Sequence, residues 1–366
     1  MALDDVLVVG GGVVGLTTAL ELAEKNVRVR VIDRGFVGQE ASWAGAGMIP
    51  PGEIHLENNA YQEMARQSYK LWPSLSENLF DLSGIHNEYM QCGAVILSED
   101  SSECDSEQQC WSKQGVETKR IASSDLAGYQ ISESMSERNA YLLAGQSQVR
   151  NPRHLQALKH ACVRLGVRIT EHQRVRALET QGKKIQAVVT DLGRYSADRV
   201  LFAAGAWSQE LGRLLQVSVP VTPIRGQIVL LNTPGQLKQI IEQGKRYLVP
   251  RADGRLLIGA TEERVGFDRR NTAQAVGGLI QFATQLVPSL ENAEVERTWV
   301  GFRPGSPDNL PLLGRAVPWE NAFVATGLYR AGLSLSPITG RLMRQLILGE
   351  SPEISLSDFS VTRFSE

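Results

Sequence analysis

The chain has 366 residues, of which 42% are apolar and 21% are charged, and its formal net charge is −2. This composition is typical of a globular protein, and the lack of any block of basic residues argues against nucleic acid as a partner. A chain of this length is too long for one simple core, so we expect two domains.

We expect the protein to be cytoplasmic and to bind no membrane. Its first five residues contain no positively charged segment of the kind that begins an export signal. The apolar stretch over residues 6–23 includes four glycines and Glu21, which argues against a membrane span. The four cysteines lack the spacing of a metal site and are expected to be free thiols, with a Cys104–Cys110 disulfide as the alternative.

The first element of the chain is a dinucleotide-binding fingerprint. It begins with a predicted strand (residues 6–9) and a glycine-rich turn, Gly10-x-Gly12-x-x-Gly15. A predicted helix (residues 16–23), a second strand (residues 27–32) and the acidic residue Asp33 follow. This order is the one needed to hold a dinucleotide. The helix N-terminus adds free N–H groups and a partial positive charge, which favour phosphate binding.

Each residue of the fingerprint has a physical role. Gly10 permits the tight turn, Gly12 lets the backbone approach a pyrophosphate, and Gly15 lets the helix pack closely on the strand. Asp33 can accept hydrogen bonds from a ribose. Because NAD and FAD use the same fingerprint, these residues alone do not decide between the two cofactors.

The next two segments differ in character. Residues 34–55 are rich in Gly, Ala and Ser, which indicates either a mobile loop or a backbone that lies close to a flat ligand. Residues 59–82 carry apolar side chains at helical spacing and predict a helix with one face in the core. The polar, Ser-rich stretch over residues 100–140 is expected to form surface helices and loops.

From about residue 150 the pattern returns to α/β and then changes. A helix that starts near Pro152 is followed by predicted strands, the last of which ends before Gly205: residues 151–165, 167–170, 173–178 and 199–204. Residues 221–300 alternate like antiparallel strands and include a hairpin with Asp253-Gly254 in its turn. The last predicted elements are a helix (residues 273–286), a strand (322–327), a glycine-containing turn (328–333) and a helix that opens at Pro337 (336–348).

Taken together, these motifs resemble the flavin amine oxidases of the D-amino-acid oxidase superfamily, and within it the bacterial glycine oxidases. The residues that carry the resemblance are spread over nearly the whole chain: Gly10-x-Gly12-x-x-Gly15, Ala41-Ser42 with Ala46-Gly47-Met48, Ala204-Gly205-x-Trp207-Ser208, Tyr247-x-Val249-Pro250-Arg251, Gly301-x-Arg303-Pro304 and Gly327-x-x-Arg330-x-Gly332.

The resemblance implies an α/β plus α+β fold. It consists of a Rossmann-like, glutathione-reductase-like FAD-binding domain with an inserted antiparallel-sheet substrate domain. The FAD-binding domain would comprise residues 1–85, 150–220 and 300–366, and the substrate-binding domain residues 86–149 and 221–299. A homotetramer is expected from the same resemblance.

The resemblance also implies which residues contact FAD: Gly10, Gly12, Val13, Val14, Gly15, Asp33, Arg34, Ala41, Ser42, Ala46, Gly47, Met48, Val175, Gly205, Leu328, Tyr329, Arg330, Ala331, Gly332, Leu333 and Ser334. Plain backbone packing is the alternative role for the glycines and alanines in this set. Covalent attachment of the flavin would need a cysteine near the C-terminal turn, and no cysteine follows Cys162. We therefore expect FAD to be bound non-covalently and expect no metal.

Three residues are expected to bind an amino acid substrate. An arginine fork can hold both oxygens of a carboxylate at once, so Arg303 and Arg330 are the candidates, and Tyr247 would add a hydroxyl. Arg246 and Arg251 are interpreted as surface charges. We assign no side chain as general acid or base, since orientation of the substrate over the flavin can account for most of the rate.

The activity implied is oxidative deamination of glycine and other small amines, such as sarcosine and small D-amino acids. A hydride passes from the substrate α-carbon to flavin N5, and oxygen then reoxidises the flavin to give hydrogen peroxide. A role in making the thiazole of thiamine follows from the same resemblance. The alternatives are a D-amino acid dehydrogenase that reduces a quinone, a non-catalytic flavoprotein subunit, and an NAD-dependent dehydrogenase.

Overall fold

The computed structural model of the chain describes residues 4–135, 137–233 and 237–364. Residues 1–3, which belong to the segment used above to argue against an export signal, lie outside the described residues. Residue 136 and residues 234–236 of the predicted substrate domain lie outside them too, as do residues 365–366 of the predicted FAD-binding domain.

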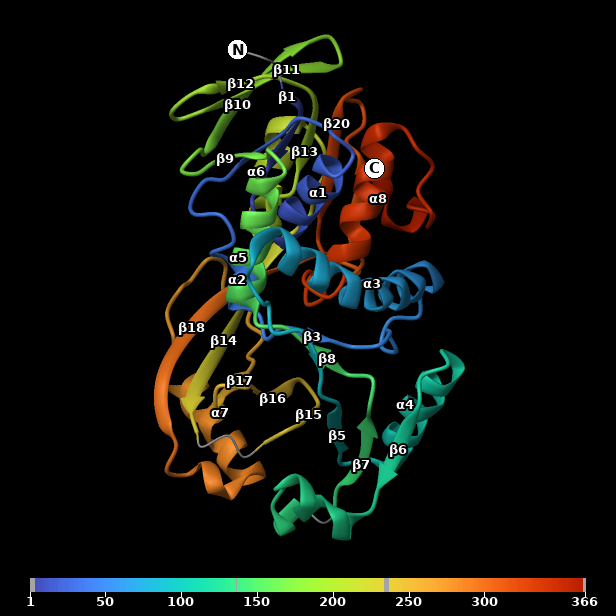
Figure 1. Cartoon of the computed structure of the whole chain (residues 1–366), viewed down its shortest axis with the longest axis vertical. Helices are drawn as coiled ribbons and strands as arrows, with labels where there is room; N and C mark the ends of the chain where they lie inside the picture. The colour runs from blue at the N-terminus through green and yellow to red at the C-terminus, as the bar shows by residue number, and fades with distance from the viewer. Residues whose placement is uncertain (1–3, 136, 234–236, 365–366) are drawn as a thin grey trace.

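A six-stranded sheet forms the upper part of the molecule in Figure 1. Its strands, in spatial order, are β19 (Leu312–Arg315), β20 (Ala322–Thr326), β13 (Ala197–Phe202), β1 (Asp4–Val9), β2 (Val29–Ile32) and β9 (Arg168–Thr170). Neighbouring strands run parallel except for β19, which is antiparallel to β20. Such a sheet, with crossovers between parallel strands, is the α/β architecture that the fingerprint predicted.

The central strand β1 is buried on both faces, which explains its unbroken apolar run. Val6 and Val8 belong to one hydrophobic core, which includes residues of the long helices. Leu7 and Val9 belong to a second core on the opposite face. The helices around the first core are α1 (Val13–Ala23), α3 (Asn59–Ser83), α5 (Asn151–Arg164) and α8 (Ser336–Leu348). Alternate side chains of a strand point to opposite faces, so a strand covered on both sides needs apolar residues throughout.

An eight-stranded sheet forms the lower part of the molecule (Figure 1). Its strands, in spatial order, are β18 (Glu294–Gly305), β14 (Thr222–Asn232), β17 (Arg255–Gly259), β16 (Arg246–Pro250), β15 (Ile240–Gln243), β5 (Ala94–Ser98), β7 (Asn139–Leu143) and β6 (Thr118–Ile121). All pairs are antiparallel except β15 with β5. The predicted hairpin over residues 247–260 is confirmed, and α7 (Ala273–Leu286) has the predicted bounds.

The stretch over residues 100–140 contains more strand than the sequence analysis predicted. A surface helix is present as α4 (Ser101–Lys113), but β6 and the start of β7 also fall in this stretch, and both strands join the eight-stranded sheet. Ile121 and Ala140 are buried there. The polar residues between the short strands concealed this pattern, because a four- or five-residue strand offers only two or three inward positions.

Smaller elements complete the chain. Two short helices are α2 (Ala41–Ala44) and α6 (Ser208–Leu215). One small sheet has β8 (Ser147–Gln148) between β3 (Met48–Ile49) and β4 (Met90–Gln91). Another consists of β10 (Val175–Gln181), β11 (Lys184–Thr190) and β12 (Arg194–Tyr195). Among the described residues, no helix is both long and apolar enough to cross a membrane. All four cysteines are free, so Cys104 and Cys110 form no disulfide.

The division into two domains stays a prediction. All strands of the six-stranded sheet come from the three ranges proposed for the FAD-binding domain. Those of the eight-stranded sheet come from the other two ranges, except that β18 continues past residue 300 to Gly305. If the division holds, β18 is an element that both domains share.

Candidate active site

The turn between β1 and α1 brings backbone segments closer together than any side chain would allow. Gly10 has φ +112°, and a Cβ atom on it would lie 2.3 Å from the Ala203 carbonyl oxygen. A Cβ atom on Gly15 would lie 2.0 Å from the carbonyl oxygen of Gly10. Both positions therefore require glycine, as the fingerprint predicted.

The N-terminus of α1 lies next to Ser42 of α2 (Ala41–Ala44). Gly12 is the N-cap and has no side chain with which to satisfy them. The Val13 N–H donates to Ser42 Oγ at 2.9 Å, which brings α2 to the helix end. The N–H groups of the first helical turn have no intrahelical partner, so those of Val14 and Gly15 are suited to a phosphate.

Asp33 lies at the end of β2 beside this turn. Its Oδ2 accepts the Gly11 N–H at 2.7 Å and its Oδ1 accepts the Gly35 N–H at 2.8 Å. Burial raises the pKa of Asp33, although the two backbone hydrogen bonds oppose the shift. The Gln173 N–H donates to the Asp33 carbonyl at 2.6 Å, which brings the start of β10, with Val175, alongside. Each carboxylate oxygen keeps a further lone pair for a ribose hydroxyl.

Arg34 and Gly205 lie near one another, around Trp207. The guanidinium of Arg34 lies 3.7 Å from the centre of the Trp207 ring and 3.5 Å from Glu40. Gly205 has φ +53° and opens the short turn that contains Trp207. Arg34 therefore has protein partners of its own, in addition to any adenosine contact that the resemblance implies.

The Gly-rich segment after α2 is held by contacts that the sequence analysis missed. Gly47 has φ +77°, and a Cβ atom on it would lie 2.0 Å from the Val149 carbonyl oxygen and 2.6 Å from Asn151 Oδ1. The Asn151 amide also donates to the Ser42 carbonyl at 2.7 Å. Asn151 thus fastens α5 to Ser42, while the Val149 N–H, which donates to the Gly47 carbonyl at 2.8 Å, holds the segment Ala46-Gly47-Met48.

The interpretation of Arg251 as a surface charge is wrong. Its guanidinium donates to the Ala46 carbonyl at 2.7 Å, to the Val149 carbonyl at 2.9 Å and to Gln148 Oε1 at 2.6 Å. Burial, together with nearby Arg150, lowers the pKa of Arg251 to about 10. Arg246 remains on the surface, where it lies over the Phe282 ring.

The turn after β20, residues 328–334, is held in place by hydrogen bonds at both of its ends. The Tyr329 N–H donates to the Pro304 carbonyl at 3.0 Å, so the turn that begins at Leu328 is fixed to β18. At its other end, the Ser334 carbonyl accepts hydrogen bonds from Ser68 Oγ at 2.6 Å and from Trp72 Nε1 at 3.0 Å. These bonds hold residues 328–334, including Ala331, Gly332 and Leu333, between β18 and α3, just before the N-terminus of α8.

Arg303 and Tyr247 converge on one face of the eight-stranded sheet, near its edge strand β18. Arg303 is on β18 and Tyr247 on β16, with β14 and β17 between them. A Cβ atom on Gly226 of β14 would lie 2.7 Å from the Arg303 guanidinium, and one on Gly259 of β17 would lie 2.2 Å from the Tyr247 ring. The two glycines let both long side chains lie across the intervening strands.

The Arg303 guanidinium and the Tyr247 hydroxyl form one polar group. Arg303 Nη1 donates to the Thr261 carbonyl at 3.0 Å, which fixes the orientation of the fork. Burial raises the pKa of Tyr247, and the hydrogen bond and charge of Arg303 oppose that shift. A guanidinium has five N–H donors, so several remain for a carboxylate.

Arg330 is placed differently. Its guanidinium forms an ion pair with Glu262, and its side chain is 41% exposed. Its charge still acts on Tyr247, which places it at the edge of the same group. The sequence analysis did not single out Glu262, because its partner Arg330 lies 68 positions further along the chain and no local pattern links the two.

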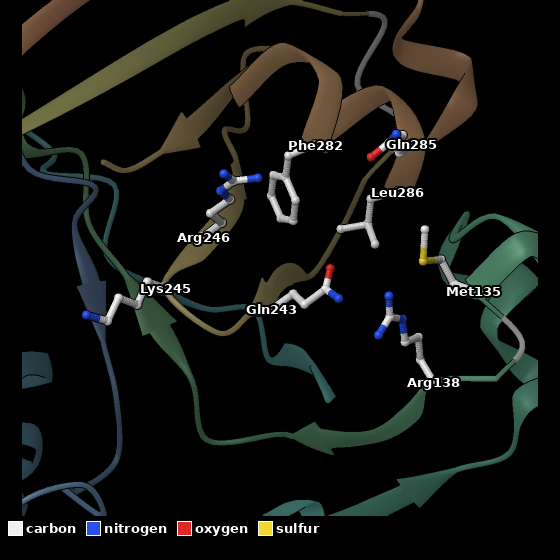
Figure 2. A pocket seen from close by; sticks show the side chains of 8 residues that line it. All are labelled: Met135, Arg138, Gln243, Lys245, Arg246, Phe282, Gln285 and Leu286. Carbon is white, nitrogen blue, oxygen red and sulfur yellow. The ribbon is translucent and has the colours of Figure 1, made fainter. Parts of the chain in front are cut away.

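A separate surface pocket lies next to the β15–β16 turn (Figure 2). The residues that line it are Met135, Arg138, Gln243, Lys245, Arg246, Phe282, Gln285 and Leu286. None of the predicted site residues is among them. Figure 2 shows Lys245 directed away from the other labelled side chains, in keeping with its ion pair with Glu262 at 3.2 Å.

Comparison with known proteins decides the family. The family model for FAD dependent oxidoreductases, DAO, matches residues 5–346. The chain belongs to this family. It is therefore an FAD-dependent oxidoreductase, and the choice that the fingerprint left between NAD and FAD is resolved.

Relatives extend the match over the full length. The chain is 35% identical over 360 residues to the glycine oxidase of Pseudomonas putida KT2440, with 97% of each protein covered. It is 35% identical over 369 residues to the bifunctional protein ThiO/ThiG of Synechocystis sp. PCC 6803, covering 98% of this chain and 54% of that protein. The crystal structure of glycine oxidase from Geobacillus kaustophilus matches with a TM-score of 0.95 at 32% identity, over 100% of both chains.

The residues present fit an FAD molecule. The glycine-lined end of α1 and the acceptor oxygens of Asp33 suit the pyrophosphate and the ribose. Among the described residues, Ser336 Oγ at the start of α8 and Asn151 Oδ1 beside Gly47 are buried without a hydrogen-bond partner. Buried polar atoms without partners are costly, so a ligand that bonds to them is favoured.

Replacing Arg251 with leucine should destabilise the protein. The change leaves two carbonyl groups and an amide oxygen without their donor, which should lower the free energy of unfolding by about 2–4 kcal/mol. We also expect FAD to be released more readily, since Ala46 loses its support. Thermal unfolding and flavin content measure the two effects. Arg246→Leu, on the surface of the same hairpin, is the control, and equal losses in the two variants would contradict this role for Arg251.

Replacing Gly259 with alanine should disturb the Tyr247–Arg303 group alone. The added Cβ atom would lie 2.2 Å from the Tyr247 ring, so the ring must move. We expect the KM for an amino acid substrate to rise about tenfold, the effect of losing about 1.4 kcal/mol of binding, while FAD stays bound. Steady-state kinetics and the visible spectrum test this. Gly277→Ala in α7, where a Cβ atom meets nothing within 4 Å, is the control.

Proposed function

We propose that this enzyme oxidises glycine and other small amines, including sarcosine and small D-amino acids. The products are the 2-oxo acid, ammonia or an amine, and hydrogen peroxide. The observation that carries the proposal is the convergence of Arg303 and Tyr247 over Gly226 and Gly259. An oriented guanidinium beside the hydroxyl of a half-buried tyrosine suits a carboxylate, which every amino acid substrate has. The glycine oxidases among the relatives support the choice of substrate.

The chain's own residues would bind and orient the substrate. Arg303 would hold both carboxylate oxygens through its fork, and the Tyr247 hydroxyl would donate to one of them. Fixing the carboxylate fixes the α-carbon, so orientation supplies much of the rate enhancement. When bound, FAD supplies the acceptor for the hydride that leaves the α-carbon. The substrate amine has to be neutral for this step, and we assign no side chain as its base.

The FAD contacts proposed are those named from the sequence, to which we add Asn151 and Arg251 as supports. Non-covalent binding of FAD, a homotetramer, a cytoplasmic location and a part in thiamine thiazole synthesis stay predictions. The ThiO/ThiG relative supports the last of these. A D-amino acid dehydrogenase that reduces a quinone is the second candidate function, because the carboxylate group of such a substrate would suit the same residues.

The first experiment is peroxide release by the purified protein in air, recorded with its visible spectrum. Glycine, sarcosine, D-alanine and D-proline are the substrates to compare. We expect a flavin spectrum and peroxide from glycine. Bleaching of the flavin without peroxide would favour the dehydrogenase. A lack of bleaching with every amine would contradict both functions and favour a non-catalytic flavoprotein subunit.

Arg303→Ala should raise the KM for glycine more than tenfold and leave bound FAD intact. Removing one partner of a buried, charged hydrogen-bonded pair costs about 2–5 kcal/mol of binding. The measurement is steady-state peroxide release together with flavin content. Arg297→Ala, at an exposed position of the same strand, should leave KM unchanged. An unchanged KM in Arg303→Ala would remove Arg303 from the site.

A further inference from the structure

Glu262 places one of the protein's own carboxylates where a substrate carboxylate was expected. Its Oε2 pairs with the guanidinium of Arg330, and Lys245 Nζ lies 3.2 Å from the same oxygen. The residue before it, Thr261, orients Arg303 through its carbonyl oxygen. Glu262 therefore directly follows, in the chain, the residue whose carbonyl oxygen orients Arg303, the candidate substrate arginine.

Glu262 stays negatively charged throughout the working pH range. Burial acts to raise its pKa, but the Tyr329 hydroxyl, Arg330 and Lys245 outweigh burial and hold the pKa at about 2. Its side chain is only 26% exposed, so water screens the charge incompletely. A second anion near Arg330 would meet this carboxylate.

The charges of the group determine how many carboxylates it can hold. Arg303 and Arg330 contribute two positive charges, and Glu262 cancels one of them. Lys245 also pairs with Glu262, but its side chain is 71% exposed, so solvent screens most of its charge. One unpaired guanidinium, that of Arg303, then remains for the ligand, and it matches a single carboxylate.

We propose that Glu262 restricts this enzyme to substrates with a single carboxylate, because it occupies Arg330 and repels a second acidic group. Glu262 is a specificity-determining residue that acts through Arg330. The inference rests on the proposed function in one respect, namely that Arg303 binds the substrate carboxylate. It predicts that monocarboxylic amines are accepted and that amines with a second carboxylate are rejected.

The test compares ligands with one and two carboxylates on the FAD-bound enzyme. Acetate is the monocarboxylate, and malonate, succinate and iminodiacetate are the dicarboxylates. Binding is followed by the change in the visible flavin spectrum, with the wild type, Glu262→Gln and Glu262→Ala. We expect at least one dicarboxylate to gain more than tenfold in affinity relative to acetate in both variants. Peroxide release should show the same change of preference from glycine toward iminodiacetate.

Two further variants separate this role from a structural one. Glu296→Gln removes a different arginine-paired glutamate, which is on β18 and pairs with Arg255, and should leave the preference unchanged. In an Arg330→Gln background, Glu262→Gln should change the preference less than twofold, because its target is gone. A preference within twofold of wild type for every dicarboxylate in Glu262→Gln and Glu262→Ala would overturn the proposal.

The binding measurement also distinguishes failure of this inference from failure of the proposed function. If acetate binds and glycine gives no peroxide, the proposed activity is wrong, and the effect of Glu262 on carboxylate number is still measured. If glycine is oxidised and the preference does not change, the inference alone is wrong. If no carboxylate perturbs the flavin of any variant, and neither glycine nor iminodiacetate gives peroxide, both are wrong.

Discussion

Backbone must approach backbone at the turn between β1 and α1, and the position of the predicted cofactor site depends on this contact. Side chains at Gly10 or Gly15 would overlap neighbouring carbonyl oxygens. With glycine at both positions, α1 begins directly after the central strand, and its first N–H group, that of Val13, donates to Ser42. Ser42 in turn fixes α2, and through Asn151 it fixes α5. One steric requirement therefore orders three helices around the place where a phosphate would bind.

In the eight-stranded sheet, glycine makes room for the side chains of other strands and not for backbone. The side chain of a strand residue normally stands above its own strand, beside the side chains of the neighbouring strands. Gly226 and Gly259 leave two adjacent strands bare, and Arg303 and Tyr247 fill the space from either side. The polar group therefore lies on the face of the sheet, over β14 and β17, next to the edge strand β18. Side chains held in this way lose little freedom when a ligand binds, which favours tight orientation of the ligand.

The residues that the sequence analysis missed are charged or polar side chains whose partners are distant in the chain. Arg251 bonds to Ala46, and Glu262 pairs with Arg330, across separations that no local pattern records. A typical arginine lies on the surface, so an interpretation from composition places Arg251 there. The short strands β6 and β7 were missed for a related reason, because few of their positions face inward and the sheet, not the local sequence, stabilises them.

The sequence by itself determined the dinucleotide-binding unit, the long amphipathic helices and the hairpin of β16 and β17. These elements follow from local rules: glycine at a tight turn, apolar spacing at 3.6 residues, and Asp253-Gly254 between two strands. The motifs of the sequence also indicated the family. Only the tertiary structure decided that Arg303 and Tyr247 meet, that Arg330 is paired with Glu262, and that Arg251 supports the Gly-rich segment. Such pairings depend on strand order and register, which bring together residues up to about 200 positions apart, and loop closure over that length leaves no local signal.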